Sequence, residues 1–320
     1  MSRCRQRHRG AIKMPIGPTA LLNSQPMGFY APAQLVRDAR EHGVVVRPVD
    51  VTISEWDSTL DEPAQGPAST RWDAHYDQPL RAVRLGLSRI NGMREQAAER
   101  IVAARKERPF ESVEDLAMRA KLDAHDLNCL ASADALLSLA GHRPDAVWAA
   151  TGVDTRPTRM LREARTFEES IEFATPEEGT EIADDYGALG LSLRRHPLAL
   201  IRPKLAEWGI RTSEELRTRA NDRETVRASG IVTHRQRQRQ RPSTAKGVIF
   251  ATLEDETGTA NIIVWPQVVE AQRRVLLGAK LLSVEDTWQS EKGVQSLVAL
   301  KLVDHTSLLG ELRTRSRDFR

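Results

Sequence analysis

Apolar residues recur at the three- and four-residue spacing of amphipathic helices through most of the first half of the chain. Residues 20–44 predict two short helices, with Pro32 in the first turn of the second helix and Gly43 at its C-terminal cap. The apolar stripe of that second helix consists of Leu35, Val36 and Ala39. Short β-branched runs then interrupt the helical pattern at residues 44–51.

The helical pattern is broken again at a turn that contains glycine. Ile90-Asn91-Gly92-Met93 separates Leu85-Gly86-Leu87 from an apolar helical face that ends at Arg105. Glycine lets a backbone approach a phosphate closely, and the free amides at the start of the next helix point outward with the positive end of its dipole. The turn therefore resembles a helix-hairpin-helix motif, which binds DNA without reading the bases.

The residues predicted to contact DNA at this hairpin are Arg89, Asn91, Gly92, Met93 and Arg94. The two arginines flank the turn and would make charge-assisted contacts with neighbouring phosphates. Many such motifs have a second glycine two positions after the first, and in this chain that position is Arg94. From the local pattern alone, an ordinary packing pair of helices is an equally good interpretation.

A second helical pair follows and favours the DNA-binding interpretation. Ser112 is a suitable N-cap for a helix from Val113, with Asp115 three residues further on. The remaining apolar positions of the pair are Leu122, Leu127, Leu130, Ala131, Leu136, Leu137 and Leu139. Tandem helix-hairpin-helix units bury an apolar face together and present two turns to one duplex. Residues 80–150 are therefore predicted to be a tandem helix-hairpin-helix domain.

Residues 151–197 are polar and acidic. They contain the pairs Glu168-Glu169, Glu177-Glu178 and Asp184-Asp185. Paired acids suggest a metal site or acid–base chemistry, but no neighbouring group would hold these carboxylates in place. We interpret the segment as a solvated acidic linker.

From about residue 225 the spacing changes to the two-residue alternation of β-strands. A helix at 198–207 would pack against the strands that follow. The predicted strands are 226–232, 248–253, 260–265, 280–288 and 295–303, with a helix at 268–277 after the third. Three strands, a helix and two strands is the order of an OB-fold barrel.

The first loop of the predicted barrel carries a row of alternating arginine and glutamine from Arg235 to Arg241. In an extended chain all the arginines project from one side, as a row of phosphate ligands would. The residues of the barrel predicted to bind DNA are Arg235, Arg237, Arg239, Arg241 and Lys246, with Trp265 and Trp288 stacking on bases. Two alternatives remain open: a neutral repeat expansion for the row, and core packing for the tryptophans.

The composition of the chain limits the kinds of partner and the cellular compartment that we expect. The chain has 320 residues, 40% of them hydrophobic, and a net charge of +3, which allows a nucleic-acid partner without requiring one. No apolar run approaches the ~20 residues that span a bilayer, so no membrane partner is expected. Cys4 and Cys129 suggest neither a disulfide framework nor a zinc site, and we predict a cytoplasmic protein. The basic first thirteen residues lack the apolar core of a targeting peptide.

Several segments resemble one polymerase family. They are residues 26–44, Arg47-Pro48-Val49-Asp50-Val51 and residues 313–319. In residue identity and order they resemble the bacterial C-family DNA polymerase III alpha-type subunit, in its error-prone, damage-induced branch. The resembling part of that subunit follows its catalytic region. The match runs from about Ala20 to the C-terminus and leaves residues 1–19 as a non-matching basic tail.

The resemblance implies an α+β multidomain chain: a helical finger remnant and a tandem helix-hairpin-helix domain, followed by a β-barrel OB-fold. Residues 20–79 would be the end of the polymerase fingers and a connector. Residues 80–150 would be the helix-hairpin-helix domain, residues 151–197 the linker, and residues 198–320 the OB-fold with a C-terminal tail.

The family copies DNA past damage with magnesium ions held by aspartates of a palm domain, which lies upstream of the matching region. No carboxylate cluster of that type is recognisable here, so we expect a DNA-binding portion that holds no cofactor and is inactive alone, from a truncated or split gene. The expected partners are single-stranded template, primer–template duplex, and the missing polymerase portion or translesion accessory proteins. A stand-alone DNA-binding adaptor in repair is the alternative, and a non-functional gene remnant is a third.

Overall fold

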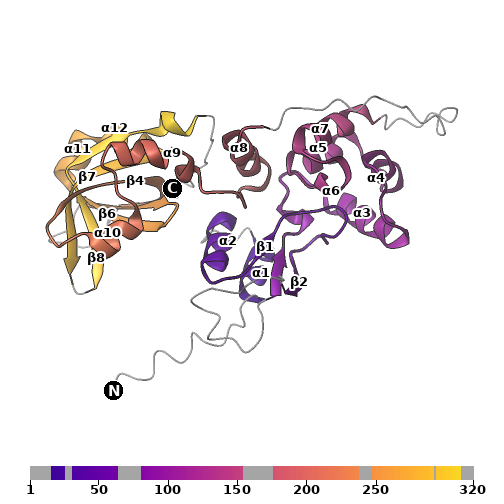
Figure 1. The fold of residues 1–320 in the computed structure, drawn as a ribbon, viewed down its shortest axis with the longest axis horizontal. Coiled ribbons are helices and arrows are strands. Elements are labelled where there is room, and N and C mark those ends of the chain that lie inside the picture. Colours follow the sequence, from indigo (N-terminus) through magenta and orange to yellow (C-terminus); the bar gives the residue numbers. More distant parts are fainter. Residues whose placement is uncertain are drawn as a thin grey trace, which may run out of the picture. The chain divides into compact units, whose positions relative to one another are not determined.

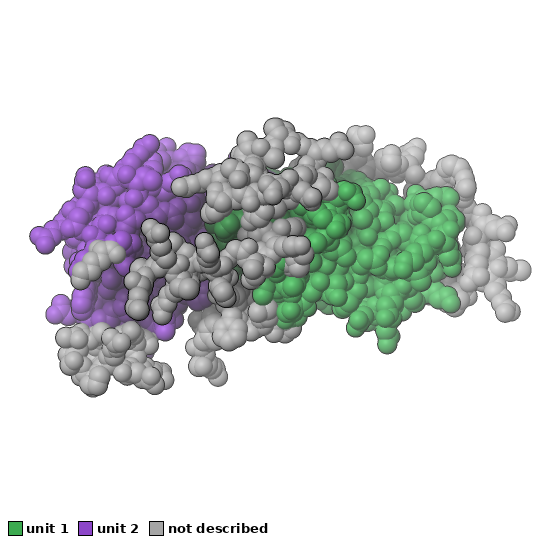
Figure 2. Space-filling view, turned by 90° about the horizontal axis from the view of Figure 1, so that it is seen from below, with its two compact units in different colours: residues 1–177, 184–193 green, residues 178–183, 194–320 purple. Residues whose placement is uncertain are grey.

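The computed structural model describes residues 16–25, 31–63, 81–153, 176–237, 247–291 and 293–310. The chain divides into two compact units, residues 1–177 with 184–193, and residues 178–183 with 194–320 (Figures 1 and 2). The first unit is mainly helical and the second is built around a β-barrel. The predicted α+β fold class is thus confirmed.

The first unit begins with two helices, α1 (Ile16–Asn23) and α2 (Pro32–Glu41), as predicted. Pro32 lies in the first turn of α2, and Gly43 has a φ of +81° directly after the helix end. A small sheet follows, made of β1 (Val46–Arg47), β2 (Thr59–Pro63) and β3 (Arg81–Arg84). β3 lies in the middle, parallel to β1 and antiparallel to β2.

Further along the described part of this unit come the short 3-10 helix η2 and a series of α-helices. They are η2 (Leu87–Arg89), α3 (Glu95–Glu107), α4 (Val113–Arg119), α5 (Ala124–Ser132), α6 (Leu137–Ala140) and α7 (Arg143–Gly152). The predicted stripe is buried at Ala97, Ala98 and Ile101 of α3. Ser112 caps α4 by accepting a hydrogen bond from the amide of Asp115, which confirms the predicted N-cap.

Part of the predicted acidic linker is the helix α8 (Glu178–Leu189). The interpretation of its acids as solvated is wrong for Asp185, which is 7% exposed. Its carboxylate accepts hydrogen bonds from the guanidinium of Arg143 and the hydroxyl of Ser192. Arg143 is also buried, and a buried guanidinium needs an acidic partner.

Besides the first part of α8, the second unit contains α9 (Pro197–Glu207) and α10 (Ser213–Arg219). Its strands and remaining helices are β4 (Thr225–Arg237), β5 (Ile249–Asp255), β6 (Gly258–Val264), α11 (Pro266–Ala271), α12 (Arg273–Gly278), β7 (Leu281–Glu291), β8 (Val294–Ala299), β9 (Lys301–Asp304) and the short 3-10 helix η3 (Thr306–Leu309). The strands follow the order β4-β5-β6-β8-β7, and β7 pairs back with β4 to close the barrel (Figure 1). β6 and β8 are parallel and the other pairs are antiparallel. The predicted OB-fold is therefore confirmed.

Strand β4 pairs with two different strands along its length. Residues 225–231 pair with β7, and residues 231–237 pair with β5. At the changeover, a Cβ on Gly230 would lie 2.7 Å from the Cβ of Leu253, so no side chain fits there. A β-bulge follows: Val232 and His234 are two residues apart on β4, but their partners Leu253 and Thr252 are adjacent on β5. One extra residue, Thr233, therefore shifts every later side chain of β4 to the opposite side of the strand.

Candidate nucleic-acid interface

The tip of the first hairpin is hydrogen-bonded to the C-terminal end of α8. Gly92 has a φ of +82°, the left-handed conformation that the motif requires. The amide of Asn91 donates to the carbonyl of Ala188 and its side-chain amide donates to the carbonyl of Gly187, both at 2.8 Å. The last carbonyls of a helix carry partial negative charge, so they occupy the donors of Asn91 as phosphate oxygens would.

Arg94 of this hairpin is bound by two carboxylates. Its guanidinium donates to Asp123, the N-cap of α5, and to Asp126, which is completely buried. The hydrogen bond from Arg94 holds the pKa of Asp123 below its ordinary value, and both acids raise the pKa of Arg94. About half of the Arg94 side chain is still exposed, so a phosphate can reach it only in competition with these acids.

The two other predicted side chains of the hairpin face the protein. Arg89 donates to the carbonyl of Leu22 at 3.3 Å, and burial lowers the pKa of Arg89. Met93 is buried in the helical core. The carbonyl of Gly92 lies 3.0 Å from Nε2 of His125 on α5. Of the five predicted residues, Asn91, Gly92 and Arg94 therefore remain exposed at the surface.

The second hairpin contains a residue that sequence reasoning missed. Lys121 has a φ of +50° and is exposed, and it precedes Leu122 as Gly92 precedes Met93 in the first turn. Arg100 of α3 fixes this turn by donating to the carbonyls of Ala120 and Lys121. The absence of a glycine hid the turn, although its position relative to the apolar residues is the same in both hairpins.

In the barrel, the β-bulge gives Arg235 a role other than the predicted one. Arg235 pairs with the buried Ala251, on the side of β4 that faces the barrel interior. Its guanidinium donates to the carbonyls of Leu276 and Ala279, so it caps the C-terminal end of α12. A cation at this end of a helix is favourable because the helix dipole is negative there. His234 and Gln236 occupy the exposed side instead.

The exposed side of β4, β5 and β6 forms the candidate base-contacting face. Phe250 of β5 is 39% exposed, and it lies between Gln236 on β4 and Ile263 on β6. Trp265 follows directly after β6 and is 48% exposed. Phe250 was missed from the sequence because it stands in a continuous apolar run, where inward and outward residues look alike.

Trp288 does not belong to this face. Its side chain is 1% exposed in the core of the barrel, so the prediction that it stacks on bases is wrong and the core-packing alternative is right. Arg239, Arg241 and Lys246 lie outside the described residues, as does the basic tail before residue 16. Arg237 pairs with Ile249 at the end of β4.

Among the described residues, no group of three or more His, Cys, Asp or Glu side chains is arranged to hold a metal ion. None of the helices in the described ranges is long and apolar enough to cross a membrane.

The chain is similar in sequence to a known motif and to known proteins. The family model of the helix-hairpin-helix motif matches residues 43–146. The chain is 51% identical over 302 residues to the error-prone DNA polymerase of Ralstonia nicotianae, covering 94% of this chain and 27% of that protein. It is 47% identical over 306 residues to the error-prone DNA polymerase of Methylococcus capsulatus, covering 94% of this chain and 29% of that protein. The chain thus spans less than a third of the length of these relatives.

Among solved structures, asparaginyl-tRNA synthetase from Pyrococcus horikoshii matches with 21% identity and a TM-score of 0.24. That match covers 29% of this chain and 22% of the synthetase chain, and it is too limited to support an argument about function.

Proposed function

Because this chain corresponds over nearly its whole length to the C-terminal part of error-prone DNA polymerases, we propose that it holds DNA during damage-induced synthesis by such a polymerase. The tandem helix-hairpin-helix domain binds the backbone of the primer–template duplex, and the OB-fold binds single-stranded template. Synthesis itself, with its magnesium ions, takes place elsewhere in the polymerase, in the cytoplasm.

The observation that carries the proposal is the pair of exposed aromatic rings, Phe250 and Trp265, on one side of the barrel. Exposing rings of this size to water is unfavourable, and it is expected where the rings contact a partner. Every nucleobase offers a flat face, so aromatic stacking binds single strands without regard to sequence. A polymerase that copies many sequences requires this kind of contact.

The helix-hairpin-helix domain supports the same function less strongly, because residues of its first turn already have partners within the protein. Gly92 and Lys121 place two left-handed turns in front of α3 and α5. Turns of this kind contact phosphates on a duplex and not base edges. The bonds from Asn91 to α8 and from Arg94 to Asp123 mean that duplex binding at the first turn replaces internal hydrogen bonds.

The test is single-strand binding by the full chain with Phe250→Ala and Trp265→Ala. Each substitution removes one stacking surface, and we expect each to weaken binding of oligodeoxythymidylate about 5- to 100-fold, as base stacking is worth ~1–3 kcal/mol. Leu300→Ala is the matched control, because Leu300 is a 63% exposed apolar residue at the junction of β8 and β9. Equal affinities for all four proteins would rule out this face as the single-strand site.

A further inference from the structure

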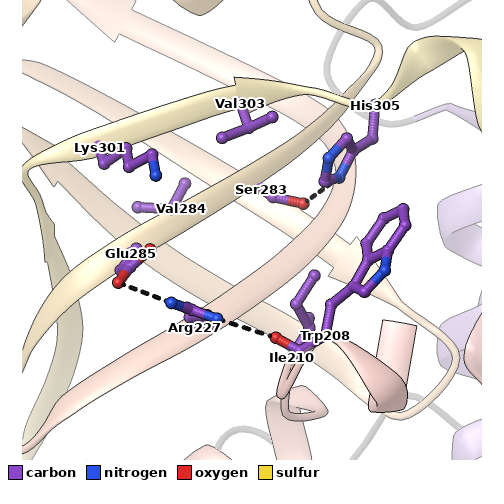
Figure 3. Close-up of a pocket in the computed structure, with 9 residues that line it drawn as sticks. All are labelled: Trp208, Ile210, Arg227, Ser283, Val284, Glu285, Lys301, Val303 and His305. Atoms are coloured by element: carbon purple, nitrogen blue, oxygen red, sulfur yellow. Dashed lines mark hydrogen bonds and ion pairs between the residues drawn. The ribbon is translucent and has the colours of Figure 1, made fainter. Parts of the chain in front are cut away.

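The barrel has a cavity on a different part of its surface from the base-contacting face. Its volume is about 230 Å³, and it lies between the end of α9 and strands β4, β7 and β9 (Figure 3). β4 pairs with β5 along one edge and with β7 along the other, and β9 pairs with β7. A ligand in this cavity therefore leaves the face with Phe250 free.

The polar groups in the wall of the cavity bond to one another. Arg227 donates to the carboxylate of Glu285 and to the carbonyl of Trp208, both at 3.1 Å (Figure 3). The hydroxyl of Ser283 lies 2.8 Å from Nδ1 of His305. Since these donors and acceptors already have partners, the wall offers little to a polar ligand and suits an apolar group.

The remaining wall is apolar and aromatic. Ile210 and Val303 line it together with the ring of Trp208. Burial lowers the pKa of His305, which favours the neutral imidazole, and a neutral ring loses less hydration than a charged one when an apolar group covers it. A volume of about 230 Å³ is below the ~300–1,000 Å³ of most small-molecule sites and is suited to a single bulky side chain.

The rim of the cavity is positively charged. Lys301 is exposed, and its charge helps Arg227 to hold the pKa of Glu285 below its ordinary value. The ammonium of Lys204 lies 5.5 Å from the centre of the Trp208 ring. Of the lining residues Glu285 alone is acidic, and Arg227 neutralises it at 3.1 Å. A ligand that approaches this rim gains from carrying negative charge.

We propose that this cavity docks a segment of a partner protein in which a bulky apolar residue is flanked by acidic residues. The apolar side chain enters between Trp208 and Val303, and the flanking carboxylates meet Lys301 and Lys204 at the rim. A nucleobase fits less well, because the Trp208 ring already contacts Lys204 and His305, and the wall has few groups left to bond a base edge. The proposal does not depend on DNA binding by the chain.

The probe is a fluorescein-labelled peptide, Ser-Glu-Asp-Phe-Asp-Glu-Ser, titrated with the full chain in 0.15 M salt and followed by fluorescence anisotropy. Two control peptides replace the Phe by Ser or the four acids by Lys. We expect saturable binding of the probe below 1 mM, and at least tenfold weaker binding of both controls, since the apolar anchor and the charges each contribute.

Two variants locate the binding. Val303→Trp fills the cavity and should weaken binding of the probe at least ~10-fold, whereas Lys301→Glu reverses the charge of the rim and should weaken it ~3- to 10-fold. Arg219→Glu reverses an exposed charge on α10 and should leave the affinity unchanged. If Val303→Trp does not fold, as judged by circular dichroism, the Lys301→Glu variant decides.

Four results would overturn the proposal. The first three are no saturable binding at 1 mM probe, equal binding of the Ser control, and equal affinity of the parent and the folded variants. Competition by oligodeoxythymidylate that Lys301→Glu abolishes would also overturn it, because the cavity would then be a nucleic-acid site. Phe250→Ala, which tests the DNA site, should not change binding of the probe.

Discussion

The first hairpin and the barrel were both expected to bind DNA, but their exposed groups differ in availability. At the hairpin, Asn91 and Arg94 already have partners within the protein. On the barrel, Phe250 and Trp265 expose about two fifths and one half of their surfaces. A motif therefore shows which contacts a segment is able to make, whereas the fold decides which of its groups are available.

The two regions should respond differently to substitution. A change at the hairpin alters stability first, because its groups hold the helical unit together. A change on the barrel face alters binding first, because Phe250 and Trp265 are exposed. Each of the following predictions tests this contrast.

The largest effect is expected for Gly92→Val. A β-branched residue is strained at a φ of +82°, and its Cβ would lie 3.4 Å from Sγ of Cys129. Strain and crowding together should lower the free energy of unfolding by about 2–4 kcal/mol. Urea unfolding gives the value.

Gly209→Ala is the control for that prediction, since Gly209 has a φ of +68° and no neighbour within 4 Å of the added Cβ. It should cost only the conformational term of about 1–2 kcal/mol. If Gly92→Val leaves stability unchanged but weakens duplex binding, the hairpin is a free DNA contact and the contrast drawn here is wrong.

Arg235→Gln should destabilise the barrel by about 1.5–3 kcal/mol, because two charge-assisted hydrogen bonds to the end of α12 are lost. Its effect on single-strand binding should be small. The measurements are urea unfolding and the dependence of affinity on salt. Arg223→Gln, at a side chain that is 89% exposed, should change neither.

A different result for Arg235→Gln would contradict the capping role of Arg235. If stability is retained while the slope of log affinity against log salt falls by ~0.7, Arg235 contacts a phosphate. The row of arginines would then bind DNA as the alternation suggests.

Asn91→Ala removes the side-chain bond to Gly187 and should cost about 1 kcal/mol. Hydrogen exchange of the Asn91 amide should also become faster, because the contact with α8 is weakened. Unchanged exchange would show that the main-chain bond to Ala188 is sufficient to hold the tip.

The smallest effect is expected for Asp123→Asn. Asn keeps the oxygen that caps α5 but removes one of the two charges that hold Arg94, so duplex affinity should rise about threefold, as exposed ion pairs are worth ~0.2–1 kcal/mol. A fall in affinity would mean that Asp123 positions Arg94 for DNA.

The same variant removes a dependence of stability on pH. The pKa of Asp123 in the folded protein is below its ordinary value of 3.8, so its ion pair stabilises the fold fully above that value and is lost as the pH falls through the lowered pKa. The difference in stability between parent and Asp123→Asn should therefore shrink in acid unfolding experiments below pH ~4.

Much of the fold could be read from the sequence because spacing and burial agree. The stripe at Ala97, Ala98 and Ile101 and the alternating strands of the barrel each have one apolar side. The strand order followed from the number of strands and the position of the helix. β3 was not predicted, because four residues with an arginine at each end carry too little pattern.

The functional residues were harder to predict, since their roles depend on partners far along the chain. Arg94 meets Asp126, thirty-two residues later, and Asn91 meets Gly187, ninety-six residues later. The bulge at Thr233 leaves no mark in the composition, yet it decides which side of β4 carries the arginines. A two-residue period predicts that alternate residues share a side, and does not say which side that is.

The bulge also has a consequence for how this strand tolerates changes in gene length. Beyond Thr233, the side of each residue depends on whether its distance from the bulge is odd or even. An Arg-Gln unit is two residues, so gain or loss of whole units by six nucleotides keeps every flanking residue of the strand in phase. Loss of a single codon directly after Thr233 would exchange the two sides and bring Gln236 to the end of α12 in place of Arg235, whereas gain of one there would bring His234. Whole Arg-Gln units after Arg235 can therefore be gained or lost without moving Arg235 from the end of α12, whereas odd changes before it cannot.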